Sequence, residues 1–226
     1  RAALEPIREA VRLTTHELGK KPLIGFCGAP FTVASYMIEG RPSRDHLRAR
    51  ALMTAEPELW ARLAQWVANI SGEFLRAQVE AGASAVQLFD SWAGSLAEAT
   101  YRAHVLPFSR SALDYVRDLD VPRIHFGVGT GHMLSAIHEA GATTVGLDHR
   151  TPIPTALKAL PAGTALQGNL DPALLFSSEE ARFDEAARIV REGRAAAGHV
   201  VNLGHGVPPG TDPQVLTDLV AFIHEQ

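Results

Sequence analysis

The sequence predicts a parallel α/β fold of the (β/α)8 barrel type, incomplete here because it contains six of the eight strands. Six short apolar runs alternate with helical patterns, which is typical of βα units. Nearly every run is followed by glycine and a polar residue. A barrel places function at the ends of many strands, whereas the alternative, a doubly wound sheet, concentrates it at one switch point. We therefore favour the barrel and expect two βα units to be absent before Arg1, leaving open strand edges near Leu23 and Val201.

The composition is that of a globular protein, and the 226 residues are predicted to form a single domain, residues 1–226. Apolar residues make up 46% of the chain and charged residues 20%, a balance that excludes a disordered chain. The net charge of −4 argues against a nucleic-acid partner. The single cysteine, Cys27, excludes a disulfide framework and a cysteine-rich zinc site. The longest uncharged run, residues 22–38, is too short and too polar to cross a membrane.

Each predicted strand is a short apolar run bounded by glycine, proline or aspartate. The six runs are residues 22–27, 84–89, 122–126, 143–147, 164–167 and 199–203. Helical patterns lie before, between and after them. Residues 5–18 form an amphipathic pattern and residues 59–79 form a long one. A last helix follows the i, i+3, i+4, i+7 spacing of Leu216, Leu219, Val220 and Ile223.

Local signals mark where the helices begin and end. Asp171 and Asp212 each precede a proline, which predicts an N-cap with proline in the first helical position. Ser177 and Glu180 have the spacing of a capping box. Glycines that close a helix before the next strand recur in similar joints, at positions 82, 141 and 198. The repeated joint supports a fold made of repeated αβ units.

A glycine loop suggests a second interpretation. Gly127, Gly129 and Gly131 follow the third predicted strand, and Asp148 ends the next one. In a nucleotide-binding βαβ unit, such a loop approaches phosphate and the acid, about 20 residues on, binds the ribose. Here His132 stands where that motif has its third glycine. The pattern therefore favours a tight turn, with Asp148 capping the segment that follows.

Metal and triad chemistry have little support in the sequence. His125 and His132 are candidate metal ligands, but no third ligand with a recognisable spacing accompanies them, so we predict no metal site. Ser91 lacks a nucleophile elbow, and Cys27 lacks a matched histidine. These patterns indicate an α/β barrel enzyme without a cofactor, and they do not indicate its substrate.

Three polar side chains that follow predicted strands each allow two interpretations. Tyr36 is either a core tyrosine or a polar group at the mouth of a site. Ser91 is either an N-cap or a hydroxyl that faces a ligand. His205, flanked by two glycines, either binds a carboxylate or hydrogen-bonds its own loop.

Five segments together resemble the uroporphyrinogen decarboxylase family, in the family's order and along essentially the whole chain. They are residues 25–39 (GFCGAPFTVASYMIE), 87–94 (QLFDSWAG), 145–148 (VGLD), 166–172 (LQGNLDP) and 202–207 (NLGHGV). The resemblance implies a (β/α)8 barrel that removes carbon dioxide from the four acetate side chains of uroporphyrinogen III, giving coproporphyrinogen III. It also implies a cytoplasmic homodimer with a tetrapyrrole substrate, no cofactor and no metal.

The resemblance also suggests roles for individual residues. Tyr36, Ser91 and His205 match the family's substrate contacts, and Phe26 and Phe89 match apolar residues that line its cleft. We expect all five to open into one cleft on one face of the barrel. The family's catalytic aspartate and substrate-binding arginines belong to an opening segment that we expect to be absent here. The catalytic residue is therefore unassigned, and we expect this chain alone to be inactive.

A related branch of the superfamily, the zinc and corrinoid methyltransferases, is the alternative. Its members carry His-x-Cys on the fifth strand, where this chain has His125, Phe126 and Gly127. Because the thiolate ligand is missing at this position, the sequence argues against zinc-dependent methyl transfer.

Overall fold

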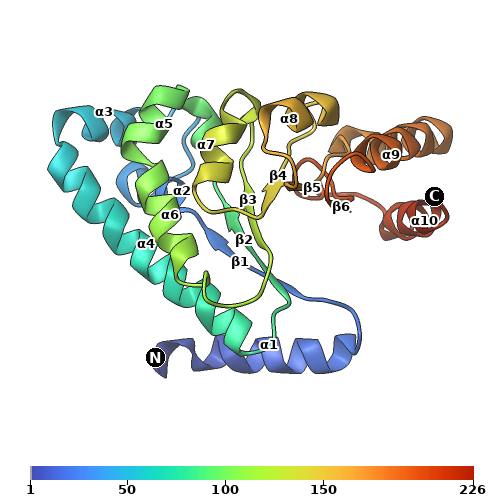
Figure 1. Cartoon of the computed structure of the whole chain (residues 1–226), viewed down its shortest axis with the longest axis horizontal. Helices are drawn as coiled ribbons and strands as arrows, with labels where there is room; N and C mark the ends of the chain where they lie inside the picture. Colours follow the sequence, from blue (N-terminus) through green and yellow to red (C-terminus); the bar gives the residue numbers. More distant parts are fainter. Residues whose placement is uncertain (1) are drawn as a thin grey trace.

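The computed structural model describes residues 2–226 and contains one sheet of six parallel strands (Figure 1). The strands are β1 (Ile24–Gly28), β2 (Ala85–Phe89), β3 (Arg123–Phe126), β4 (Thr144–Gly146), β5 (Ala165–Gln167) and β6 (His199–Val200). Each strand overlaps one of the six predicted runs. The prediction of six strands separated by helices is therefore confirmed.

The order of the strands decides the fold class. β1 to β6 lie side by side in sequence order, and every neighbouring pair is parallel. A doubly wound sheet would reverse its order at a switch point. The sequential order is that of an incomplete (β/α)8 fold, as predicted. Among residues 2–226, β1 and β6 each pair on one side only, so the sheet is open near Leu23 and Val201.

Helices precede, connect and follow the strands. They are α1 (Glu5–Leu18), α2 (Pro30–Glu39), α3 (Leu47–Ala55), α4 (Pro57–Glu80), α5 (Glu98–His104), α6 (Leu106–Asp114), α7 (Leu134–Glu139), α8 (Ile153–Ala159), α9 (Glu179–Gly193) and α10 (Pro213–His224). Short 3-10 turns are η1 (Ala2–Leu4), η2 (Ala93–Ser95), η3 (Gly131–Met133) and η4 (Pro172–Phe176). The helices predicted at residues 5–18, 59–79 and around 216–223 are confirmed. Within the part of the chain described, no helix is both long and apolar enough to cross a bilayer.

The predicted caps are confirmed in part. Asp171 and Asp212 each accept a hydrogen bond from a backbone N–H two residues further on, at 2.9 Å. The predicted capping box at Ser177 is wrong, because Ser178 is the N-cap of α9. The Ser177 hydroxyl instead donates to the carbonyl of Leu174 at 2.8 Å and closes η4. Because η4 ends at Phe176 and Ser177 closes it, α9 is capped by Ser178, one residue later than predicted.

Two of the three predicted glycine joints are also confirmed. Gly82 and Gly141 follow α4 and α7 with φ of 120° and 102°, in the range that favours glycine. The joint at Gly198 is wrong as a helix end, because α9 already stops at Gly193. The residues between Gly193 and β6 form a turn. The third joint therefore connects a turn, and not the end of a helix, to the next strand.

The apolar core lies between the sheet and its helices, and Trp60 on α4 is one of its largest buried side chains. Figure 1 shows α4 and α6 side by side against the strands.

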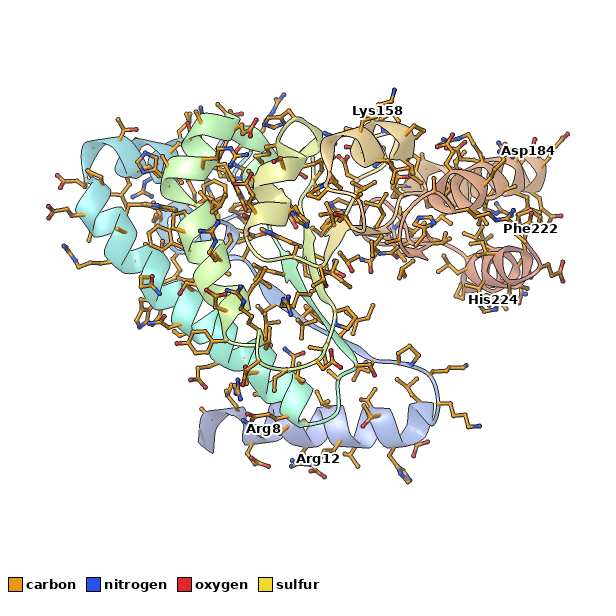
Figure 2. The ribbon with its side chains drawn as sticks, in the orientation of Figure 1. Arg8, Arg12, Lys158, Asp184, Phe222 and His224 are labelled. Atoms are coloured by element: carbon orange, nitrogen blue, oxygen red, sulfur yellow. The ribbon has the colours of Figure 1, made fainter. Side chains whose placement is uncertain are left out.

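At one end of the molecule, Phe222 lies between α10 and α9, its ring stacked on Phe183 with centroids 4.3 Å apart (Figure 2). Near the N-terminus, Arg8 pairs with Glu80 at 2.9 Å and joins α1 to the end of α4. Half-exposed ion pairs of this kind contribute about 0–1 kcal/mol, so apolar burial dominates the stability.

The thiol of Cys27 on β1 is expected to be unreactive in the native protein. Burial raises its pKa to about 12, and the thiol donates a weak hydrogen bond to the carbonyl of Ser71. Only the thiolate reacts with disulfide reagents, so at pH 8 we expect native labelling to be about a thousandfold slower than for a free thiol. Labelling with Ellman's reagent before and after unfolding in urea measures this. Rapid stoichiometric labelling of the folded chain would contradict the burial of Cys27.

Candidate functional site

Because all strands are parallel, the loops that follow them gather at one edge of the sheet. Hydrogen bonds continue past the strand ends and hold these loops in register. The N–H of Ala29 donates to the carbonyl of Phe89 at 2.7 Å, and the N–H of Asp90 donates to the carbonyl of Phe126 at 2.7 Å. The site residues predicted from the sequence lie on or after β1, β2 and β6. Phe26 is in β1, Tyr36 in α2 and Phe89 in β2, and Ser91 and His205 are on the loops after β2 and β6.

Phe26 and Phe89 lie beside each other and line a cavity of about 250 Å³. Their rings meet edge to face with centroids 5.6 Å apart, and Phe89 makes a similar contact with Phe126 at 5.9 Å. The side chain of Phe26 is 58% exposed. An exposed phenylalanine beside a cavity provides an apolar surface on which a flat ligand can rest.

A pair of glutamines in this cavity escaped the sequence analysis. Nε2 of Gln167 donates to Oε1 of Gln87 at 2.9 Å, which joins β5 to β2. Both side chains are buried and both line the cavity of Phe26 and Phe89. Oε1 of Gln167 is buried and has no hydrogen-bond partner among the described residues. The signal that could have identified them is a glutamine within each of two otherwise apolar strand runs.

Tyr36 is a surface residue of α2 and not a core tyrosine. Its side chain is 45% exposed, and its ring stacks on Trp92 with centroids 3.9 Å apart. The ring of His46 also lies against Trp92, at 4.3 Å, and Nδ1 of His46 lies 3.3 Å from the hydroxyl of Ser95. Burial lowers the pKa of His46, which favours the neutral ring. Trp92 thus contacts both Tyr36 and His46, and neither Trp92 nor His46 was singled out from the sequence.

Ser91 directly precedes Trp92, the residue whose ring stacks on Tyr36. It is half-buried in the loop between β2 and η2, so its hydroxyl does not cap a helix. The residue before it, Asp90, is completely buried. Tyr36 contacts Trp92 and Ser91 is next to Trp92 in the chain, but a common site formed by Tyr36 and Ser91 stays a prediction.

His205 lies on the loop after β6 and is exposed. The backbone N–H of the preceding residue, Gly204, donates to the carbonyl of Leu170 at 2.7 Å, which anchors this loop. The cavity of Phe26 and Phe89 is lined by residues on β1 and β6 but not by His205, Tyr36 or Ser91. The structure thus brings Phe26 and Phe89 together, and a single cleft that also includes Tyr36, Ser91 and His205 stays a prediction.

The nucleotide-binding interpretation of the glycine loop is not supported by the structure. Oδ2 of Asp148 accepts the N–H of Gly129 at 2.8 Å, and Oδ1 accepts the hydroxyl of Thr151 at 2.9 Å. The Asp148 side chain is fully buried. Because this carboxylate holds its own loop and the start of the next segment, it is not available to a ribose. The tight-turn interpretation is the one that the geometry supports.

His125 and His132 also bond within the protein. Nδ1 of His125 lies 3.2 Å from the carbonyl of Ile137, and complete burial lowers its pKa to about 4. The two ring nitrogens of His132 lie 3.1 Å and 2.8 Å from the carbonyls of Gly129 and Leu96. Within residues 2–226, no group of three His, Cys, Asp or Glu side chains is placed to hold a metal ion.

Sequence comparison finds close relatives of this chain. A family model described as uroporphyrinogen decarboxylase matches residues 1–226. A curated uroporphyrinogen decarboxylase from an Arthrobacter species is 58% identical over 98% of this chain, and one from Salinispora tropica is 56% identical over 97%. The chain spans 64% and 59% of the lengths of these two relatives, less than two thirds of each.

Structural comparison supports the fold. A methyltransferase from Methanosarcina mazei superposes with a TM-score of 0.80, covering 97% of this chain and 63% of that one at 18% identity. At this identity the likeness concerns the fold alone. The family match, in contrast, extends over all 226 residues and agrees with the motifs of the strand-end loops. The chain therefore belongs to the uroporphyrinogen decarboxylase family.

Proposed function

We propose that this chain acts, within a uroporphyrinogen decarboxylase, in converting the four acetate side chains of uroporphyrinogen III to methyl groups, giving coproporphyrinogen III. The match of the family along residues 1–226 carries the proposal. The placement of Tyr36 on α2, and of Ser91 and His205 on loops, supports it, because all three follow the carboxyl ends of strands, where barrel enzymes hold their substrates.

The reaction itself explains why side chains without a cofactor can suffice. Protonation of a pyrrole ring carbon makes the ring an electron sink. The pair of electrons of the bond to the departing carboxylate then moves into the ring, and carbon dioxide leaves. A proton added to the remaining carbon gives the methyl group, and the ring loses its extra proton. The protein must orient the macrocycle and exclude water.

The described residues have chemistry suited to this task. The apolar rings of Phe26 and Phe89 offer a dry surface to the flat faces of the pyrroles. The hydroxyls of Tyr36 and Ser91 and the imidazole of His205 are donors for carboxylates of the substrate. No described residue is assigned here as the proton donor to the ring.

We further propose that residues 1–226 do not complete the reaction by themselves. The substrate carries eight carboxylates and this chain has a net charge of −4, so binding requires local cations. In addition, the described sheet is open at β1 and β6, so the cavity between these strands is not enclosed. We also propose a homodimer as the working state, which light scattering would measure.

The experiment that tests the proposal is an anaerobic assay with uroporphyrinogen III, followed by separation of the oxidised porphyrins. A full-length protein that includes this chain is expected to form coproporphyrinogen, and the 226 residues alone are expected to form none. If the full-length protein leaves the substrate intact but transfers methyl groups from a methylcorrinoid to a thiol, the proposed function is wrong. Turnover by the 226 residues alone would refute the proposed inactivity.

His205→Ala in the full-length protein is expected to weaken substrate binding by about 1–3 kcal/mol, the cost of leaving a substrate carboxylate without its partner. Turnover of bound substrate is expected to persist, because His205 has no proposed part in the chemistry of the ring. Steady-state kinetics separate the two effects. His224→Ala, near the end of α10, is the matched control and should leave both constants unchanged. Loss of kcat with an unchanged KM would contradict this role.

A further inference from the structure

A completely buried carboxyl group lies directly before Ser91. Asp90 has no exposed surface, and its main chain is held on both sides. Its N–H donates to the carbonyl of Phe126 at 2.7 Å, and its carbonyl accepts the N–H of Ala93 at 3.1 Å. Burying a carboxyl group is costly unless it is hydrogen-bonded, so its partners indicate what the group does.

The partner of Asp90 is the hydroxyl of Thr32 on α2. This hydroxyl donates to Oδ1 of Asp90 at 2.8 Å and accepts the backbone N–H of Trp92 at 3.3 Å. A continuous series of hydrogen bonds therefore runs from Trp92 through Thr32 to Asp90. Because Thr32 lies one helical turn before Tyr36, the same series connects the loop after β2 to the helix that carries Tyr36.

The stacking of Tyr36 on Trp92 is a second connection between the same two elements. The rings are 3.9 Å apart, and Trp92 directly follows Ser91. Two independent contacts, one polar and one aromatic, thus fix α2 and the loop after β2 relative to each other. Without the polar contact, the partly exposed ring of Tyr36 would be held mainly by one stacking partner.

We propose that Asp90 is a positioning residue that acts through Thr32 to set the placement of Tyr36 and Ser91 against the substrate. The inference rests on the proposed function, since it concerns how these two substrate contacts are presented. Neither Asp90 nor Thr32 is required to touch the substrate. The series of hydrogen bonds has both ends inside the protein, so the site is organised before the substrate arrives.

The electrostatics agree with a structural carboxyl group that is not permanently ionised. Burial raises the pKa of Asp90 to about 7, and the hydrogen bonds from Thr32 act in the opposite direction. Oδ2 has no partner among residues 2–226, which leaves it free to carry a proton while Oδ1 still accepts from Thr32. Tyr101 is the ionisable neighbour: its phenol is also buried, and the nearby Asp90 contributes to raising its pKa.

The test compares Thr32→Val with Thr32→Ser in the full-length protein. Valine keeps the shape of threonine but removes the hydroxyl, whereas serine keeps the hydroxyl. Hydrogen exchange of the Trp92 amide reports the hydrogen bond without reference to activity. We expect Thr32→Val to accelerate this exchange about tenfold. The same variant should raise KM about tenfold and change kcat less than about threefold. Thr32→Ser should stay close to wild type in all three quantities. Asp90→Asn, which keeps the acceptor, should resemble Thr32→Ser.

Two results would overturn the proposal. One is a Thr32→Val protein with wild-type exchange at Trp92 and wild-type KM. The other is a Thr32→Ser protein that is as impaired as Thr32→Val, which would mean that packing and not the hydroxyl matters. If wild-type protein fails to decarboxylate uroporphyrinogen, the proposed function fails. The exchange at Trp92 then still decides whether the hydrogen bonds through Thr32 hold the loop.

Discussion

Gly204→Ala is expected to raise the KM of the full-length enzyme for its tetrapyrrole substrate at least about tenfold, and Gly206→Ala is expected to change it less than about twofold. The two glycines flank His205. A Cβ added to Gly204 would lie 2.2 Å from the backbone nitrogen of His149, whereas nothing lies within 4 Å of one added to Gly206. Backbone atoms cannot move aside as a flexible side chain can. The loop must therefore shift in Gly204→Ala, whereas it can keep its position in Gly206→Ala.

The shift would break the bond from the Gly204 N–H to the carbonyl of Leu170 and move the adjacent His205. Overpacking of this kind also costs about 1–3 kcal/mol of unfolding free energy. Steady-state kinetics and urea unfolding of both variants measure the two effects. Equal KM values for the two variants would show that the position of His205 is not set by this close approach.

Trp60→Ala is expected to lower the free energy of unfolding by about 3–5 kcal/mol, and Trp66→Ala by less than about 1 kcal/mol. Both residues lie on α4, so helix propensity changes equally. Trp60 is 1% exposed, whereas Trp66 is 53% exposed. The indole N–H of Trp60 also donates to the carbonyl of His104 at 2.7 Å, which ties α4 to the end of α5.

Urea unfolding followed by circular dichroism measures both changes, provided that the slope of the transition is unaltered. Trp60→Phe should fall between the two, because it fills most of the space but leaves the carbonyl of His104 without its donor. A loss of similar size for Trp60→Ala and Trp66→Ala would mean that α4 does not bury the face that carries Trp60.

The sequence alone predicted the elements and their order, because both depend on short-range signals. Apolar runs bounded by glycine and proline identified the six strands to within a few residues, and alternation with helices indicated parallel pairing. Helix N-caps were equally predictable where the capping side chain accepts a hydrogen bond from a backbone N–H two residues further on, as at Asp212. Two local predictions failed, Ser177 as a cap and Gly198 as a helix end, because turns of neighbouring segments shifted both helix ends.

The tertiary structure alone decided how the side chains meet at the site. Gln87 and Gln167 pair across 80 residues because strand order brings β2 and β5 to the same cavity. Trp92 supports Tyr36, and Thr32 binds Asp90, only because the loop after β2 lies against α2. His132 in place of a third glycine favoured a tight turn, but only the structure shows that the carboxylate of Asp148 binds its own loop. Local propensity sets the elements, but contacts between distant loops depend on long-range packing, which a single sequence does not display.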